Sequence, residues 1–269
     1  MQLSSATTAV RPTLRAAHVA VQEGRDAAPV LPAARPTCRT CPRRDACLAQ
    51  GLADGDAGIL DGLLVGQRRV RRGEFVVFEG QPSKYLYAVR SGSLKASVTT
   101  FEGREQVTGF AFPGDVVGFD ALADGRHAAT SAALEDSVVC AIPQDLLQWQ
   151  AADARGALAR QLHRKMGAAL VRDRERALLL TRTNAESRVA SFLLMVARRQ
   201  GGDGVERAEL DLSMSREEIG SYLGLALETV SRALSAFARR GWIAVDRRRV
   251  RLLRAGCLAE EDGYSRCDA

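Results

Sequence analysis

The chain has few aromatic residues, few histidines and no long apolar run. Aromatic residues make up 5% of its 269 residues, and histidine occurs three times. No stretch of about 18 apolar residues occurs, so the sequence predicts no transmembrane helix and no membrane partner. The N-terminal segment also lacks the apolar core of a secretory signal. We therefore expect a cytoplasmic protein.

The composition is that of a globular, basic protein. Apolar residues make up 46% and charged residues 26%, with a formal net charge of +6. A chain of this length can form two domains, each with its own core. The positive charge is compatible with a polyanionic partner, although many soluble proteins share it.

Cysteines are clustered near the N-terminus. Cys38, Cys41 and Cys47 lie within ten residues, and Cys140 lies in a predicted strand. In a chain without an export signal, clustered cysteines more often bind metal or do redox chemistry than form disulfides. Four thiolates suit a [4Fe–4S] cluster and equally suit tetrahedral zinc, and spacing alone leaves both open.

The remaining cysteines carry no recognisable chemistry. Cys257 and Cys267 belong to the C-terminal tail, and we interpret them as incidental. A catalytic cysteine would need an accompanying His/Asp constellation, which the sequence does not offer. We therefore expect that the protein is not an enzyme.

Residues 72–143 carry the pattern of a small β domain. Short apolar runs are separated by glycine-containing turns at 74–78, 85–89, 94–99, 106–111, 128–134 and 137–142. Closely spaced short strands with turn residues between them predict a β-sandwich or jelly-roll barrel.

Residues 145–183 predict a long helix on which two apolar registers compete. One register runs through Leu158, Leu162, Met166 and Leu170. The other has heptad-like spacing through Ala159, His163, Met166, Leu170, Asp173 and Ala177. Such a stripe can pair with a symmetry mate, or it can pack on the chain's own β domain. We expect His163, Met166, Leu170, Asp173 and Ala177 at a homodimer interface.

Residues 184–253 predict a helix-turn-helix. Helices are expected at 185–200, 216–223 and 227–240, with Gly224 permitting a left-handed turn between the last two. One face of the last helix is apolar and comprises Leu227, Val230, Ala233, Leu234 and Phe237. The opposite face carries Glu228, Ser231, Arg232 and Ser235, which suits contact with base edges.

This outer face predicts direct reading of DNA bases. Arg232 can donate two hydrogen bonds to guanine, and Glu228 can accept one from cytosine. The expected DNA-contacting residues are Glu228, Thr229, Ser231, Arg232 and Arg216. A hairpin over 242–253 with Arg247, Arg248, Arg249 and Arg251 would be a wing on the phosphate backbone, or an ordinary charged edge.

Several segments resemble the CRP/FNR superfamily of bacterial transcription regulators, and within it the oxygen-sensing FNR proteins. The resemblance covers residues 36–255. It rests on Tyr85-Leu-Tyr-Ala-Val-Arg-Ser-Gly-Ser-Leu-Lys95, Glu105-Gln-Val-Thr-Gly-Phe110, Gly114-Asp-Val-Val-Gly-Phe-Asp120, Val139-Cys-Ala-Ile-Pro143 and Ser215-Arg-Glu-Glu-Ile-Gly-Ser-Tyr-Leu-Gly-Leu-Ala-Leu-Glu-Thr-Val-Ser-Arg232.

The resemblance implies an α+β chain with an N-terminal β-roll (jelly-roll, cyclic-nucleotide-binding-like) sensor domain, a long dimerisation helix and a C-terminal winged helix-turn-helix. We expect a flexible leader over 1–35, the cluster-binding segment and β-roll over 36–144, and the dimerisation helix over 145–182. The DNA-binding domain then spans 183–256, and a loose tail spans 257–269.

The resemblance also implies an oxygen-labile [4Fe–4S] cluster held by Cys38, Cys41, Cys47 and Cys140. The cluster would control dimerisation and binding to a palindromic TTGAT-like site. Asp173 would repel its symmetry mate and keep the dimer marginal. The loop Thr100, Phe101, Glu102, Gly103 and Arg104 corresponds to a position that contacts RNA polymerase in relatives.

The sequence is also compatible with other signals. Nitric oxide, haem or a small-molecule ligand would each suit a regulator of this superfamily. The cyclic-nucleotide branch needs a Gly-Glu pair and an Arg-Ser pair, where this chain has Gly118-Phe-Asp and Arg126-His-Ala. Pro42 and Ala46 beside the cysteines depart from the FNR pattern and leave the oxygen threshold open.

Overall fold

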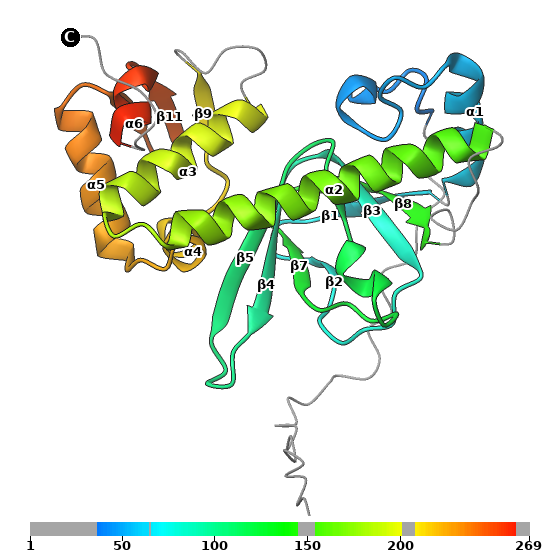
Figure 1. Cartoon of the computed structure of the whole chain (residues 1–269), viewed down its shortest axis with the longest axis horizontal. Helices are drawn as coiled ribbons and strands as arrows, with labels where there is room; N and C mark the ends of the chain where they lie inside the picture. Colours follow the sequence, from blue (N-terminus) through cyan, green and yellow to red (C-terminus); the bar gives the residue numbers. More distant parts are fainter. Residues whose placement is uncertain (1–36, 65, 145–153, 201–207, 262–269) are drawn as a thin grey trace, which may run out of the picture.

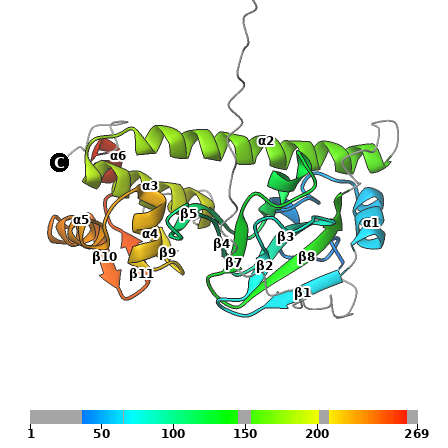
Figure 2. The ribbon, with the colours of Figure 1, turned by 90° about the horizontal axis from the view of Figure 1, so that it is seen from below.

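The computed structural model describes residues 37–64, 66–144, 154–200 and 208–261. A β domain and a smaller helical domain lie side by side along one helix, α2 (Ala154–Leu180), which spans both (Figures 1 and 2). The leader expected over 1–35 lies outside the described residues. In the described part of the chain, no helix combines the length and apolar character needed to cross a membrane.

The β domain is built from two four-stranded antiparallel sheets. One sheet has the order β1 (Gly66–Val70), β8 (Ser137–Pro143), β3 (Tyr85–Ser91) and β6 (Val116–Val117). The other has the order β2 (Phe75–Val77), β7 (Thr130–Ala133), β4 (Leu94–Thr99) and β5 (Glu105–Ala111). Buried side chains of both sheets, among them Val76, Leu94 and Val139, form a common core. The predicted β-roll is confirmed.

The sequence pattern did not predict β1. This strand reads Gly-Gln-Arg-Arg-Val, and Arg68 within it is 8% exposed. Two nitrogens of the Arg68 guanidinium donate to the carbonyl oxygens of Val76 (3.0 Å) and Phe75 (2.6 Å), and these hydrogen bonds join β1 to β2. Because a charged residue occupies a buried position of this strand, the sequence lacks the apolar–polar alternation that predicts a strand.

The N-terminal part of α2 packs on the chain's own β domain. Leu158 and Leu162 are 1% and 0% exposed, in one cluster with residues of α1 (Asp54–Leu63) and of the cysteine segment. Farther along α2, Leu170 and Leu178 are 55% and 68% exposed. The first residues of the Leu158–Leu170 register are therefore buried within the chain, whereas Leu170 is left exposed.

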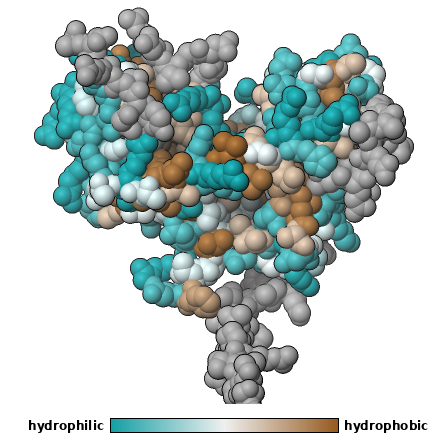
Figure 3. All heavy atoms as spheres, viewed as in Figure 1, coloured by the Kyte–Doolittle hydropathy of each residue, from teal (hydrophilic) through white to brown (hydrophobic). Residues whose placement is uncertain are grey.

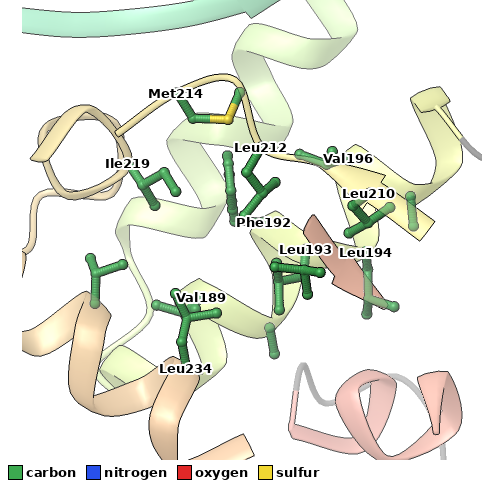
Figure 4. Close-up of a cluster of buried hydrophobic side chains, with 14 of the residues drawn as sticks. Val189, Phe192, Leu193, Leu194, Val196, Leu210, Leu212, Met214, Ile219 and Leu234 are labelled. Atoms are coloured by element: carbon green, nitrogen blue, oxygen red, sulfur yellow. The ribbon is translucent and has the colours of Figure 1, made fainter. Parts of the chain in front are cut away.

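The helical domain contains α3 (Ala185–Gln200), α4 (Arg216–Leu223) and α5 (Leu227–Arg239), followed by the strands of the wing. These strands, β10 (Ile243–Asp246) and β11 (Arg249–Leu252), form a sheet with β9 (Glu209–Asp211) in the order β10-β11-β9. Phe192, Leu193, Ile219 and Leu234 lie in the core between the helices (Figure 4). The fold as a whole is the expected α+β arrangement.

Two predicted details of this domain were wrong. The first residues of the tail expected to be loose after Gly256 lie in a helix, α6 (Ala255–Glu261), in which Cys257 and Leu258 are 3% and 0% exposed. A helix of seven residues has too few apolar positions to show a period. Leu227, expected on the buried face of α5, is 44% exposed because it is the first residue of that helix.

Candidate metal centre and nucleic-acid interface

The three N-terminal cysteines lie on a chain of tight turns. The amide of Arg44 donates to the carbonyl of Cys41 (3.0 Å), and the amide of Cys47 donates to the carbonyl of Arg44 (3.3 Å) around the short helix η1 (Arg44–Ala46). At the start of the segment, the amide of Cys38 donates to the Asp61 carboxylate on α1. The turns fold the segment back on itself, so that its cysteines face one region.

The structure brings Cys38, Cys41, Cys47 and Cys140 to a single pocket. Cys140 comes from the middle of β8, where it pairs with Ala88 of β3. The rest of the lining is made of apolar residues, among them Leu48, Leu60, Leu64 and Ile142, and of the arginines Arg43, Arg44 and Arg90. All four cysteines are partly buried and free of disulfides. The pocket therefore combines four thiols with apolar and cationic neighbours.

Burial favours the neutral form of three of the thiols, those of Cys38, Cys47 and Cys140. Burial raises the pKa of Cys140 to about 12, and neighbouring Cys47 adds to the effect. Burial raises the pKa of Cys38 well above its usual range, and the nearby Asp61 carboxylate adds to it. Burial also raises the pKa of Cys47, although Lys165 acts in the opposite direction. Thiolates here need a positively charged partner, and metal binding supplies one.

The arrangement of the four cysteines can be compared with the ligand arrangement of a zinc site and of a [4Fe–4S] cluster. A zinc site needs four sulfurs at about 2.3 Å from one point. Among the described residues, no three Cys, His, Asp or Glu side chains converge closely enough to hold a single metal ion. A [4Fe–4S] cluster takes one thiolate at each of its iron atoms, so its ligands surround a larger volume. Four thiols around one pocket are the number of ligands that such a cluster takes.

The two segments that depart from the cyclic-nucleotide pattern, Gly118–Asp120 and Arg126–Ala128, contact each other. The Asp120 carboxylate accepts hydrogen bonds from the amides of Ala128 (2.7 Å) and Ala129 (3.1 Å). Its other oxygen lies 3.6 Å from Nδ1 of His127, which is 4% exposed. Burial opposes ionisation, but His127 and the two amides hold the pKa of Asp120 below its usual value. The backbone donors that follow Arg126 are therefore used by an internal carboxylate.

The helix-turn-helix is fixed by local signals at each end of α4. Ser215 accepts a hydrogen bond from the amide of Glu218 (3.1 Å), and the Glu218 carboxylate accepts one from the amide of Ser215 (2.7 Å). This capping box starts the helix. Gly224 ends it in the left-handed conformation, with φ of 63°. Arg188 of α3 donates to the carbonyl of Leu223 (3.1 Å) and holds this end in place.

The predicted polar face of α5 faces solvent. Glu228, Arg232 and Ser235 are exposed, and Thr229 and Ser231 are half-buried. Val230, Ala233, Leu234 and Phe237 are buried on the other side. Arg216 begins α4 and is half-buried, and burial lowers its pKa. The donor Arg232 and the acceptor Glu228 are thus presented together on α5, whereas Arg216 lies on α4.

The wing is a tight hairpin. Asp246 pairs with Arg249, so the turn consists of Arg247 and Arg248 alone. Arg247 has a φ of 53°, a conformation that glycine or asparagine usually adopts. All four arginines of the wing are exposed. An arginine at a strained position presents a cation at the tip.

The expected polymerase-contacting loop is the tip of the hairpin between β4 and β5, which projects from the body in Figure 1. Phe101 there is 97% exposed. The amide of Thr100 donates to the carbonyl of Arg104 (2.9 Å), and Glu102 forms an ion pair with Arg104. The tip is thus an ordered turn with an aromatic side chain in solvent.

Some residues around the cysteine site had no sequence signal. Lys165 on α2 donates to the carbonyl of Ala46 (2.6 Å), and Asp61 accepts from Cys38. A surface helix contains many lysines and aspartates in such positions. Their contacts depend on how α1 and α2 pack, which no local pattern specifies.

Comparison with known proteins agrees with this geometry. Residues 67–153 match the cyclic nucleotide-binding domain family, and residues 187–261 match the Crp-like helix-turn-helix domain family. The structure is similar to FixK2 from Bradyrhizobium japonicum, with a TM-score of 0.66 and 32% identity over 74% of this chain and 98% of that one.

Two curated relatives match most of the chain. The fumarate and nitrate reduction regulatory protein of Escherichia coli K12 is 36% identical over 232 residues, which are 85% of this chain and 91% of the relative. Electron transport regulator A of Shewanella oneidensis is 38% identical over 208 residues, 77% of this chain and 83% of the relative. With its β-roll, long helix and Crp-like helix-turn-helix, the chain belongs to the CRP/FNR family of DNA-binding transcription regulators.

Proposed function

We propose that this regulator responds to oxygen through a [4Fe–4S] cluster bound by Cys38, Cys41, Cys47 and Cys140. The observation that carries the proposal is the convergence of these four thiols, from two distant segments, on one pocket. Similarity to regulators of fumarate and nitrate reduction, and to an electron transport regulator, supports the same proposal. When bound, the cluster supplies an oxygen-sensitive centre that joins the N-terminal segment to β8.

Loss of the cluster would release the cysteine segment from β8 and would thereby affect helix α2. The cysteine segment packs against the same cluster of side chains as Leu158 and Leu162 of α2. Lys165, one turn further along, binds the backbone of Ala46. Release of the segment therefore removes packing and one hydrogen bond from the first half of α2, and with it support for the helix that pairs with a second copy.

A homodimer is supported by the unpaired face of α2. His163, Leu170, Asp173 and Ala177 are exposed, and Met166 is half-buried. Apolar residues are visible in Figure 3 across the middle of the face that α2 crosses in Figure 1. A twofold dimer places two copies of α5 about one DNA turn apart, which implies a palindromic site with TTGAT-like halves. We place RNA polymerase contact at the loop from Thr100 to Arg104.

The test is anaerobic purification of the full chain, followed by iron, sulfide and zinc analysis. The expected result is about four iron and four sulfide per chain, the content of one cubane cluster. Visible absorbance should then fall on exposure to air, and the dimer should dissociate in the same samples. Stoichiometric zinc with no effect of air would contradict the proposal. A cluster that survives air but reacts with nitric oxide would contradict oxygen as the signal.

Asp173→Ala should strengthen the dimer of the cluster-free chain. Two carboxylates facing each other across the twofold axis repel by about 1 kcal/mol at about 4 Å in water. Removing them should lower the dimer dissociation constant by roughly fivefold, since about 1.4 kcal/mol corresponds to tenfold. Sedimentation equilibrium in air measures the dimer dissociation constant.

Glu175→Ala is the matched control for this experiment. Glu175 is exposed on the same helix, two residues further on, and therefore points about 160° away from Asp173. The substitution removes the same charge and should leave the constant nearly unchanged. Equal effects of the two variants would show that net charge matters and that Asp173 is not at the interface.

Arg232→Ala should weaken binding to the cognate site by about 1–3 kcal/mol and relax the base preference at one position. The exposed guanidinium on α5 is the donor best suited to guanine. Arg232→Lys retains the charge but not the paired donors, so it should retain the salt dependence and lose the preference. Titrations against a set of half-site variants measure both. A uniform loss on all sequences would mean that Arg232 contacts phosphate only.

A further inference from the structure

One partly buried carboxylate joins the β domain to the helical domain. Asp115 lies in the turn between β5 and β6 and accepts a hydrogen bond from the amide of Phe112 (2.7 Å). Its carboxylate also forms an ion pair with Arg199 of α3, and it lies 3.7 Å from Arg172 of α2. The side chains of Asp115 and Arg199 are 14% and 17% exposed. One side chain therefore contacts three elements that the proposed switch must connect.

Gly114, the residue before Asp115, contacts the cysteine segment. Gly114 has a φ of 98°, and a Cβ atom on it would lie 2.3 Å from the carbonyl oxygen of Ala46 and 2.9 Å from its carbonyl carbon. Ala46 directly precedes Cys47, and its carbonyl also accepts the hydrogen bond from Lys165. The backbone beside a cysteine thus rests on the turn that holds Asp115, without any intervening side chain.

On the other side, Arg199 is firmly attached to this turn. Its guanidinium donates to the carbonyl of Phe110 (2.9 Å) and lies 4.6 Å from the ring centroid of Phe112. Arg199 belongs to the last turn of α3, whose Phe192 and Leu193 lie in the core against which α4 and α5 pack. A displacement of Arg199 is therefore passed to the DNA-reading helices as a displacement of the whole domain.

We propose that Asp115 is a positioning residue through which the cysteine segment sets the placement of the DNA-binding domain within one protomer. The proposal rests on the proposed function and adds a route that does not pass through the dimer. Separating two partly buried charges without new partners is costly, so the pair moves together when the turn moves. The cysteine segment acts on Gly114, and Arg199 carries the movement to α3.

Several other contacts between the domains do not involve the cysteine segment. Lys95 forms an ion pair with Glu218 (3.1 Å), and Ser93 and Ser213 share a hydrogen bond (2.5 Å). The ring of Phe110 packs against that of Tyr222, with 5.1 Å between their centroids. These contacts hold the domains together but do not touch Ala46, so they serve as controls.

Hydrogen exchange on the full chain, kept free of metal, tests the proposal independently of the cluster. Gly114→Ala should speed exchange about tenfold or more in peptides covering residues 44–50, and also in peptides covering residues 195–200 of α3. Gly125→Ala is the matched control, because Gly125 has a similar φ of 76° and a Cβ on it would meet nothing within 4 Å. Faster exchange at 44–50 with no change at 195–200 would overturn the proposal.

The reverse experiment covers the case in which Gly114→Ala does not fold. Coupling between two sites is reciprocal, so Arg199→Gln should speed exchange at residues 44–50, although it lies on the other domain. Arg199→Lys, which retains the charge, should restore most of the protection. Lys95→Gln breaks the other ion pair and should leave 44–50 unchanged. If Lys95→Gln and Arg199→Gln act alike on 44–50, the effect is loss of domain contact in general, and the proposal fails.

The same variants in cluster-loaded protein separate this inference from the proposed function. Arg199→Gln should retain a wild-type iron content and weaken operator binding about tenfold or more under anaerobic conditions, a size within the usual range of coupling between sites. Absence of iron in the wild-type chain would refute the proposed function and leave the exchange result standing. Wild-type iron with undiminished operator binding in Arg199→Gln would refute the positioning role alone.

Discussion

Cys140→Ala should leave the chain unable to retain iron and reduce its operator affinity toward that of non-specific binding, about a thousandfold or more. Cys140 is the one thiol of the pocket that comes from the β-roll, in the middle of β8. Without it, three thiols remain on one loop, and nothing of the metal centre ties that loop to the sheet. Iron analysis and anaerobic operator titration measure the two effects.

Val138→Ala is the control for this prediction. Val138 lies two residues before Cys140 on the same strand, so its side chain is on the same face, and it is also half-buried. The variant loses side-chain volume without losing a sulfur, and we expect a wild-type iron content and operator affinity. If Cys140→Ala still binds four iron atoms per chain, Cys140 is a core residue and the ligand set is different.

The sequence predicted those parts of the fold that depend on local signals. The bounds of α3 and α4 were predicted as residues 185–200 and 216–223, as observed. At α4 the reason is visible, since Ser215 with Glu218 starts the helix and Gly224 ends it. Both are interactions between residues a few positions apart. The strands of the β-roll were found for a similar reason, because glycine-containing turns separate them.

Features that depend on distant contacts were not predictable in this way. Arg68 is an inward-facing side chain of β1, and its burial is tolerated because carbonyl groups of β2 accept its hydrogen bonds. Spacing alone could not say that Cys140 approaches the N-terminal cysteines. The family resemblance was needed for that prediction, and the structure places all four at one pocket. The Asp115–Arg199 pair joins two domains and had no sequence signal at all.

The same substitution should have opposite effects at two glycines of the DNA-binding domain. Gly220 lies inside α4, and a Cβ atom on it would be 2.5 Å from the carbonyl oxygen of Leu225. The turn between α4 and α5 closes directly over this position, with the amide of Leu225 donating to the carbonyl of Gly220 (2.9 Å). Gly220→Ala must therefore push the turn away, and overpacking of this kind costs about 1–3 kcal/mol.

Gly256→Ala is the contrasting variant. Gly256 is exposed in α6 of the same domain, and a Cβ on it would meet nothing within 4 Å. An alanine in a helix is more stable than a glycine by about 0.5–1 kcal/mol, so this variant should be slightly stabilised. Denaturant unfolding measures the stability of both variants.

Because Gly220→Ala also displaces α5 relative to α3, we expect it to weaken operator binding under conditions where the domain remains folded. A stabilised Gly220→Ala variant with wild-type operator affinity would mean that the two helices of the reading motif are not packed as closely as the structure has them.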